Sequence, residues 1–520
     1  MSTSAGPAAA PGERSSRRDP RLLGSLHRRR LPSRLVPVVA GLVATLVTLI
    51  GAGVPSWWND EAATLRLARL PVAQMLEFTQ QKDAVHLVHA LLVHAWIGVA
   101  GDSELAVRSL SAVAVGVAAA GVVVLVRDLG RPRAALLAAT VFVLLPRVSS
   151  IGVEARSSAL AVALVVGAAV WSVRAGRDGR WWRWALLGLL TGAAIAVFAY
   201  AALVVPALVL LALGARRRAH GAGVGRTLAG LAAALAGAVL VASPVVLEAA
   251  GQSAQIGWLR TQPVTAWTVL VEPAFDQAWW VALLVVGVVV AGLVTRSRER
   301  RRPGRVAGTA EESRRASLTT VALATWLVGP ALVLLLATAV VGPTYTPRYL
   351  AVSMPALAVV VALAAARWRR PVVVAVVVAL VLAALPVVVA QRGPVAKPAG
   401  VDLRGVAQLL QEEARPGDAV LLSDEGTVSR RPRIALAAYP EAFAALDDVA
   451  FERSWVETGT YSDVLVGGDE LVARLRGVDR VWVALPEAGD DDLVETVREA
   501  GLAPGEEQRV AGVGVTLWQR

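Results

Sequence analysis

Residues 35–62 read LVPVVAGLVATLVTLIGAGVPSWWNDEA, and the order of residues in this stretch sets the reading of the whole chain. The part from Leu35 to Val54 carries no charge and is long enough to cross a bilayer as a helix. Two tryptophans and then two carboxylates, Asp60 and Glu61, follow it directly. Because tryptophan is enriched at membrane interfaces, the sequence predicts ionisable groups at a membrane–water boundary.

The composition is that of a polytopic membrane protein. Of the 520 residues, 56% are hydrophobic, and they fall in long blocks of Ala, Val and Leu. Cysteine is absent, which excludes disulfides, Cys-based metal sites and a thiol nucleophile. All basic residues except Lys82 and Lys397 are arginines, a usage typical of a high-GC bacterial genome.

The net charge of +12 hides two oppositely charged parts. From residue 399 onward there are 23 Asp and Glu against 12 Arg, a net of −11, whereas the preceding part has 17 acidic and 40 basic residues, a net of +23. We therefore expect a basic membrane part followed by an acidic domain. No nucleic-acid partner is expected, because the arginines lie in short clusters between apolar segments, where membrane topology explains them.

About eleven transmembrane helices are predicted. They lie near 35–55, 104–126, 134–150, 157–173, 184–200, 201–215, 227–247, 277–295, 318–341, 348–366 and 371–390. Arginine clusters occupy alternate loops, at 127–133, 174–183, 216–218, 296–315 and 367–370. This alternation satisfies the positive-inside rule for a multi-pass plasma-membrane protein with a cytoplasmic amino terminus. The pair 184–215 is the least defined, because no polar loop divides it.

The same frame predicts four regions. Residues 1–34, rich in Ser, Pro, Gly and Arg, are expected to be a disordered basic cytoplasmic tail. Residues 35–390 form the transmembrane domain, residues 391–400 a Pro- and Gly-rich linker, and residues 401–520 an acidic extracytoplasmic domain. Within the long external loop 56–103, the apolar stretch from His86 to Ala100 is too short for a span and suits a helix lying in the interface.

The last region reads as a small α/β domain. Helical spacing is found at 403–413 and 491–500, and strand patterns at 419–422, 478–485 and 510–517. Alternation of the two kinds of element favours a sheet covered by helices. The region contains no phosphate-binding glycine loop and no nucleophile elbow.

Several charged residues are predicted to lie together on the outer side. Asp60 is a candidate general base at the interface, although charges beside a span end are also commonly just solvated. Glu154 and Arg156 follow the third span, and Arg348 opens the tenth. An arginine at such a place either snorkels to the interface or pairs in a cavity with a carboxylate or a ligand phosphate.

The histidines of the external loop favour a polar cavity over a metal site. His86, His89 and His94 are spaced so that only the first two share a helical face, and no carboxylate-rich ligand set accompanies them. We expect no metal and no cofactor. Asp83, just before His86, is the better candidate for lining an external cavity.

Together these features resemble the polytopic glycosyltransferases that use polyprenyl-phosphate sugars and have the GT-C fold. The motifs are Asp60-Glu61 after the first span, Asp-Ala-Val-His at 83–86, Glu-Ala-Arg at 154–156 and Pro-Arg-Tyr-Leu at 347–350. The likeness runs from about residue 56 to 363. It is greatest to the protein O-mannosyltransferase and aminoarabinose-transferase branch, family 39, and within it to actinobacterial mannosyltransferase-like proteins of the cell wall.

The resemblance implies a role for each candidate residue. Asp60 is implied to be the catalytic base with Glu61 in support, and the reaction to be an inverting sugar transfer to an acceptor hydroxyl on the outer face. The donor is a polyprenyl-phosphate sugar, by default of mannose, and the acceptor a glycan, lipid or protein. The residues implied to contact the substrates are Asp83, His86, Glu154, Arg156, Tyr345 and Arg348. The two arginines are expected to face the departing phosphate.

Two departures from the family pattern keep alternatives open. Ser157 and Ser158 follow Arg156 where Pro and Tyr are usual, and Leu87 and Val88 follow His86 where aromatic residues are usual. A transporter of lipids or solutes also has charged residues lining a cavity, but it often shows repeated spans, which are not seen here. A non-catalytic homologue that binds lipid-linked sugar is the third possibility. The final domain is expected to bind the acceptor or cap the cavity.

Overall fold

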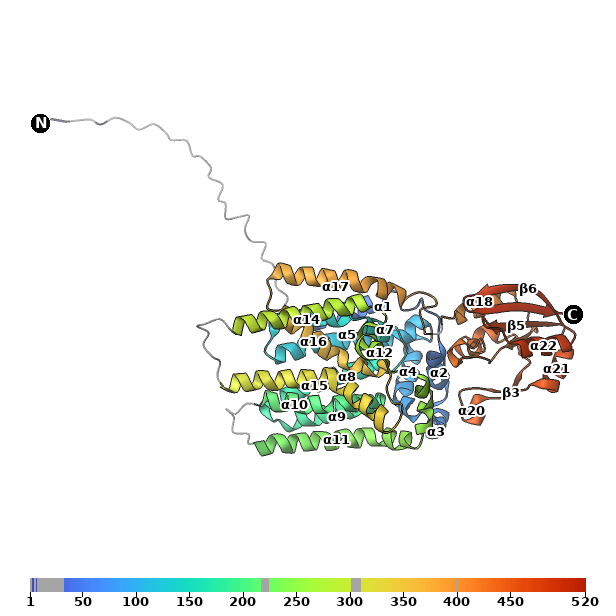
Figure 1. The fold of residues 1–520 in the computed structure, drawn as a ribbon, viewed down its shortest axis with the longest axis horizontal. Coiled ribbons are helices and arrows are strands. Elements are labelled where there is room, and N and C mark those ends of the chain that lie inside the picture. Colours follow the sequence, from blue (N-terminus) through green and yellow to red (C-terminus); the bar gives the residue numbers. More distant parts are fainter. Residues whose placement is uncertain (1, 4–5, 7–31, 217–223, 301–309, 399) are drawn as a thin grey trace.

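A computed structural model describes residues 2–3, 6, 32–216, 224–300, 310–398 and 400–520. Most of the segment predicted to be a disordered amino-terminal tail lies outside this range, as do parts of the loops at 216–218 and 296–315. Within the described residues the chain forms a bundle of long helices, a layer of short helices at one end, and a domain built around a sheet beyond that layer (Figure 1).

The bundle contains a helix at each of the eleven predicted spans. The helices are α1 (Leu35–Leu49), α5 (Glu104–Asp128), α6 (Ala135–Leu144), α7 (Pro146–Gly152), α8 (Ser158–Asp178), α9 (Trp181–Val197), α10 (Val205–Ala215), α11 (Val224–Ala250), α14 (Trp279–Arg300), α15 (Ala310–Val340), α16 (Met354–Ala365) and α17 (Arg370–Ala390). Two 3-10 segments, η4 (Ala199–Val204) and η7 (Pro347–Ser353), lead into α10 and α16. The predicted α-helical polytopic fold is therefore confirmed.

Fewer than eleven of these elements meet a strict test for a span. Among the described residues, seven are long and apolar enough to cross a membrane, and an eighth is obtained if α6 and α7 count as one. This pair bends by 67° because Pro146 forces Leu145 into an extended conformation and so ends α6. The other three predicted spans, α1, α9 and 199–215, are apolar but only 10–17 residues long.

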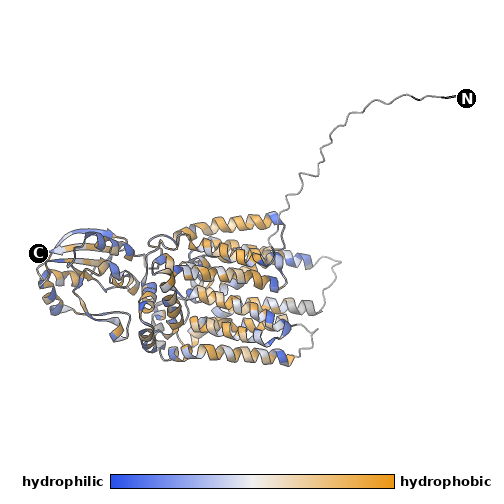
Figure 2. Cartoon of the chain, turned by 180° about the vertical axis from the view of Figure 1, so that it is seen from behind, coloured by the Kyte–Doolittle hydropathy of each residue, from blue (hydrophilic) through white to orange (hydrophobic). Residues whose placement is uncertain are grey.

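The bundle buries small residues inside and presents large ones outside. A Cβ atom added at Gly41 of α1 would lie 2.9 Å from the carbonyl oxygen of Gly116 of α5, so these two helices approach as closely as only glycine allows. Leu240, Leu336 and Leu382 are instead exposed on outer helices. The hydropathy colouring in Figure 2 shows this apolar belt along the bundle, which is the surface that lipid would cover.

The external loop folds into the layer of short helices at one end of the bundle. These are α2 (Asn59–Arg69), α3 (Val72–Gln81), η2 (Ala84–His86) and α4 (Leu87–Ala100), joined by η6 (Ser253–Thr261), α12 (Ala266–Leu270) and α13 (Glu272–Phe275) from the loop before α14. Asp60 and Glu61 lie in the first turn of α2, where the helix dipole favours negative charge. The stretch predicted as an interfacial helix is α4.

The tail domain, residues 401–520, contains a five-stranded sheet with helices on both faces, so the predicted small α/β domain is confirmed. The strand predicted at 510–517 is interrupted by a turn at 511–512. The strand order is β2-β1-β5-β7-β6, with β1 parallel to β2 and β5 and with β7 antiparallel to its neighbours. The strands are β1 (Ala419–Leu422), β2 (Asp447–Asp448), β5 (Arg480–Pro486), β6 (Ala503–Val510) and β7 (Val513–Gln519), beside a separate pair, β3 (Phe451–Arg453) and β4 (Val464–Leu465). The helices are α18 (Leu403–Glu413), α19 (Ile434–Ala438), α20 (Trp455–Thr458), α21 (Gly468–Arg476) and α22 (Asp491–Glu499), with single turns η8 (Val428–Arg430) and η9 (Pro440–Phe443).

The tail domain is docked on the rest of the chain at two places, the start of α5 and the short helices α2 and α3. At the first, Arg404 of α18 binds Glu104 at 2.7 Å, and the hydroxyl of Tyr439 donates to the same carboxylate at 2.8 Å. At the second, the segment 455–463, which we call the strap, lies against α2 and α3. Gly459 in the strap has a φ of +63°, and a Cβ added there would lie 4.0 Å from the Cβ of Gln81 in α3. The two surfaces are therefore in direct contact.

This contact predicts that a disulfide forms between Gln81→Cys and Gly459→Cys. The spacing of 4.0 Å is within the range that disulfides span, and the natural chain has no cysteine to compete. A cysteine at this left-handed position costs about 1–2 kcal/mol, which the cross-link offsets. In membranes oxidised by copper phenanthroline, the double variant should resist labelling by maleimide–polyethylene glycol until it is reduced.

The control pairs Gln81→Cys with Gly467→Cys, because no atom lies within 4 Å of a Cβ added at Gly467. This pair should label on both thiols under all conditions. Equal labelling of the two double variants after oxidation would show that the strap is not docked on α3.

Candidate functional site

Asp60 stands between two arginines that come from distant parts of the chain. Its Oδ2 atom is 3.1 Å from Nη1 of Arg348 and 3.5 Å from Nη2 of Arg156. Arg156 also donates from Nη1 to the main-chain oxygen of Asp60 at 3.2 Å. About a quarter of the Asp60 side chain is exposed, and 42% of Arg348 is exposed. The site is therefore a carboxylate with two cations and an open edge.

Aromatic rings surround the more exposed arginine. The guanidinium carbon of Arg348 is 5.6 Å from the ring centroid of Trp58 and 5.4 Å from that of Trp258 in η6. Both distances are in the range of cation–π contacts, which hold a guanidinium group over a ring face. The orientation of Arg348 is thus set by rings on two sides and by Asp60.

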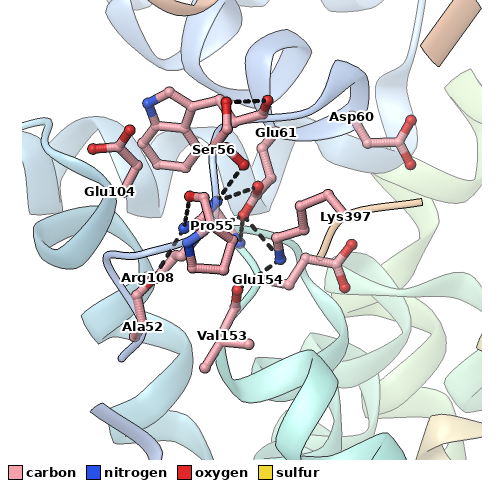
Figure 3. A network of polar contacts seen from close by, with 12 residues as sticks. Ala52, Pro55, Ser56, Asp60, Glu61, Glu104, Arg108, Val153, Glu154 and Lys397 are labelled. Carbon is pink, nitrogen blue, oxygen red and sulfur yellow. Dashed lines mark hydrogen bonds and ion pairs between the residues drawn. The ribbon is translucent and has the colours of Figure 1, made fainter. Parts of the chain in front are cut away.

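Glu61 is placed differently from its neighbour. It is fully buried, and its two oxygens accept from Nε and Nη2 of Arg108 at 2.9 and 2.7 Å. Oε1 also accepts from the main-chain nitrogen of Ala155 at 2.7 Å and lies 3.8 Å from Nζ of Lys397 (Figure 3). Burial raises the pKa of Glu61, but the charges of Lys397 and Arg108 and these hydrogen bonds outweigh it, so that the pKa is lowered.

Arg108 is buried as completely as its partner. Besides Glu61 it donates to the carbonyl oxygens of Ala52 and Pro55, at 2.9 and 2.7 Å, and to that of Ser56 at 3.2 Å. Its guanidinium carbon is 4.6 Å from the ring centroid of Trp57. Arg108 therefore joins α5 to the whole turn between α1 and α2. In Figure 3 the Asp60 carboxylate points away from this network, although it is the adjacent residue.

Glu154 lies beside this network. Figure 3 shows its carboxyl group next to Lys397, which donates to the carbonyl oxygen of Val153 at 2.8 Å. Burial and the charge of Glu61 raise the pKa of Glu154 against the opposing effect of Lys397. Glu154 is thus a weaker acid than Glu61.

A small cavity adjoins Arg156. Its polar lining consists of Thr64, Asp83, His86, His89, Arg156 and Tyr461. Nε2 of His86 is 3.5 Å from Nη2 of Arg156, and burial together with the arginine charge lowers the pKa of His86 well below its ordinary value. Burial and the charge of Arg156 also lower the pKa of His89, to about 3. The imidazoles of His86 and His89 are therefore both neutral at pH 7. His94 bonds elsewhere, to the carbonyl oxygen of Ala68.

The structure thus brings together six of the eight residues singled out from the sequence: Asp60, Asp83, His86, Glu154, Arg156 and Arg348. Glu61 supports the site from behind, as its bonds to Arg108 show. Tyr345 is buried with Leu334 and Leu350, and its hydroxyl donates to the carbonyl oxygen of Thr268 at 2.6 Å. That hydroxyl is therefore committed to holding α12, and burial raises the pKa of Tyr345 to about 12.

Four residues at the site were not among those predicted from the sequence: Arg108, Lys397, Trp258 and Tyr461. Arg108 breaks the positive-inside rule at the outer end of a span, which is the signal that drew attention to Arg348. Lys397 is one of two lysines in the chain. No group of three or more His, Asp or Glu able to hold a metal ion is found among the residues that the structure describes.

Part of the chain matches a known protein family. Residues 84–247 match the family described as dolichyl-phosphate-mannose-protein mannosyltransferase. The matched segment contains His86, Glu154 and Arg156, whereas Asp60 and Arg348 lie outside it. No curated protein sequence matches the chain.

The fold matches that of a protein of known structure over nearly the whole length of both chains. ArnT from Cupriavidus metallidurans aligns with a TM-score of 0.57 in its apo state and 0.54 when bound to undecaprenyl phosphate. The sequence identity is 13% in both cases, and the alignments cover 92% of this chain and 97% of ArnT. The likeness to the GT-C fold that the sequence motifs indicated is thereby confirmed.

The Glu61–Arg108 pair predicts a large loss of stability in Glu61→Gln. The amide keeps the shape of the side chain but leaves the Arg108 charge buried without a counter-charge, which costs about 3–5 kcal/mol. The variant should unfold at a clearly lower temperature than the wild type in detergent, measured by intrinsic tryptophan fluorescence.

Asp60→Asn is the matched control, since it makes the same chemical change one residue earlier. Its ion pairs are partly exposed, so its loss should be about 1 kcal/mol or less. Equal unfolding temperatures for the two variants would contradict the structural role assigned to Glu61.

Proposed function

We propose that the chain is an integral membrane glycosyltransferase. It transfers a sugar, by default mannose, from a polyprenyl-phosphate donor to an acceptor hydroxyl on the outer face of the membrane. The observation that carries this proposal is the placement of Asp60 between Arg156 and Arg348 at the end of the bundle. Such a site offers a base to the acceptor and cations to a phosphate at the level where a lipid headgroup lies.

The comparisons support the class of donor. The matched family is described by a dolichyl-phosphate-mannose substrate, and ArnT, which shares the fold, has been solved with undecaprenyl phosphate bound. Both are polyprenyl phosphates. The exposed edge of Arg348 and the flanking Trp58 and Trp258 suit a phosphate held at a membrane interface.

The proposed reaction is a single displacement. Asp60 takes the proton of the acceptor hydroxyl, whose oxygen bonds to the anomeric carbon of the sugar. The bond between that carbon and the phosphate oxygen breaks on the opposite side, and its electron pair leaves with the lipid phosphate. Attack from the face opposite the leaving group inverts the anomeric configuration. Arg156 and Arg348 stabilise the charge that develops on the phosphate, without a metal ion or a cofactor.

The two arginines also hold Asp60 in place before the acceptor arrives. Their guanidinium groups have five donors each, so both can bond a phosphate while keeping a contact to the carboxylate. To Glu154, on the same segment as Arg156, we assign the task of accepting from a sugar or acceptor hydroxyl.

Asp60→Asn is predicted to lower the rate of transfer by about 10²–10⁴-fold, the usual contribution of a general base. The assay supplies membranes with radiolabelled polyprenyl-phosphate mannose or arabinose and extracted acceptors. The loss should appear with folding intact, since the stability of this variant stays close to that of the wild type. Transfer at the wild-type rate by Asp60→Asn would overturn the role of the base.

Absence of transfer by the wild type from every polyprenyl-phosphate donor would favour one of the two alternatives, a non-catalytic homologue or a transporter. In that case, retained binding of the donor would indicate a non-catalytic homologue, and movement of the lipid between leaflets a transporter.

The membrane topology is the second test of the proposal. Because the tail domain is docked on α2 through Arg66 and Asp463, it must lie on the same side of the membrane as Asp60. We expect alkaline phosphatase fused after Arg520 to be active and a fluorescent protein fused there to be dark. The opposite pair of results would place the site in the cytoplasm and would refute the outer-face reaction.

A further inference from the structure

The strap of the tail domain is tied to the helix that carries Asp60. Nη2 of Arg66 in α2 is 3.0 Å from Oδ2 of Asp463, and Nη1 donates to the carbonyl oxygen of Tyr461 at 2.9 Å. The other oxygen of Asp463 accepts from the main-chain nitrogen of Trp455 at 2.9 Å, which closes the strap on itself. Both charged side chains are largely buried, with 16% and 12% exposed, so this contact is part of the folded structure and not a loose surface pair.

Aromatic rings fill the space between the strap and α3. The ring of Phe78 meets those of Trp455 and Tyr461 edge to face, with centroids 5.0 and 5.2 Å apart. The guanidinium carbon of Arg66 lies 5.4 Å from the Trp455 centroid. Such pairs prefer one relative geometry, so the ring of Tyr461 has a defined direction.

That direction takes the Tyr461 hydroxyl into the cavity beside Arg156. It forms a hydrogen bond with the side chain of Asp83, and both residues line the cavity. Asp83 adopts a left-handed conformation, with φ 61° and ψ 36°, at the start of η2. A strained residue of this kind persists where its surroundings hold it, and such residues cluster at functional sites.

Arg156 lines the cavity and also contacts Asp60. Beside it, the carboxyl group of Asp83, the phenol of Tyr461 and two neutral imidazoles offer hydrogen-bond donors and acceptors in a buried setting. The free space is about that of one water molecule, so it fits a single hydroxyl group and not a whole sugar ring.

From this geometry we infer that Tyr461 and Asp83 form a subsite that reads one hydroxyl of the donor sugar. The tail domain thus contributes a specificity-determining residue to the site on α2. The inference rests on the proposed glycosyl transfer. In this arrangement the sugar ring lies between the cavity and Asp60, with the phosphate toward Arg348, and one ring substituent enters between Tyr461, Asp83 and His86.

The test scans the donor hydroxyl by hydroxyl. Wild-type protein and Tyr461→Phe are assayed with whichever of polyprenyl-phosphate mannose or arabinose the wild type uses, and with the set of its mono-deoxy analogues. For the wild type, we expect one analogue to lose at least tenfold in kcat/KM, because a site built to bond a hydroxyl leaves its own groups unpaired when that hydroxyl is missing. In Tyr461→Phe this analogue and the parent donor should react within about threefold of each other.

Two further variants separate recognition from docking. Tyr439→Phe removes a hydroxyl from the other docking point, where it bonds Glu104, and should keep the wild-type pattern across the analogues. Asp83→Asn keeps an acceptor for the phenol and should weaken discrimination at the same sugar position as Tyr461→Phe. Unfolding temperatures in detergent report whether each variant is folded.

The outcomes are distinct. An unchanged pattern in Tyr461→Phe, or an equal loss with every donor, would overturn the inference and leave Tyr461 a docking residue. If Tyr461→Phe changed the relative kcat/KM values among deoxy analogues of the acceptor, and not among those of the donor, the inference would also be overturned. Failure of the wild type to transfer from any donor would instead remove the proposed function on which the inference rests.

Discussion

The buried ion pair between Glu61 and Arg108 is the interaction on which the site depends. Isolated charges with no water around them are costly, and this pair is stable because each hydrogen-bonding group has a partner. Through it, α5, the turn after α1 and the segment before α8 are fixed to one another. The consequence for the site is geometric, because Glu61 cannot rotate out, and Asp60, about 100° away around the helix, must therefore face a different side of α2.

Asp60, on the partly exposed side of α2, is also held by arginines, but its ion pairs are not closed off from solvent. Arg156 and Arg348 come from segments that are 192 residues apart in the chain, and both reach the same oxygen of Asp60. This side is partly exposed, and its ion pairs can exchange partners with a ligand. Two carboxylates with different surroundings thus lie next to each other in the sequence. Glu61 is buried with all its partners and holds the backbone, whereas Asp60 is partly exposed and is available for chemistry.

Much of this arrangement could be predicted from residue patterns, and the rest depends on contacts that leave no pattern. Arg156 and Arg348 could be found because an arginine on the outer side of a span needs a reason. The helix at 403–413 and the strand at 419–422 match the structure residue for residue, since the helix has clear periodicity and the strand is a short apolar run that begins after a turn signal. Strand β6 has no such signal, because it is an exposed edge strand with a proline and several charges. Tyr461 could not be placed, because the docking surface is made of single residues from a short loop.

Lys397 makes the linker between the two domains a part of the membrane domain. This residue belongs to the stretch that connects the bundle to the tail domain, yet its ammonium group is buried beside Glu61 and Glu154. The connection is therefore an internal part of the membrane unit, and it balances negative charge there. A gene fusion with its breakpoint before this lysine would leave Glu61 with Arg108 as its counter-charge and would remove the cation beside Glu154. A boundary at which the tail domain could be exchanged is therefore expected after Lys397, not before it.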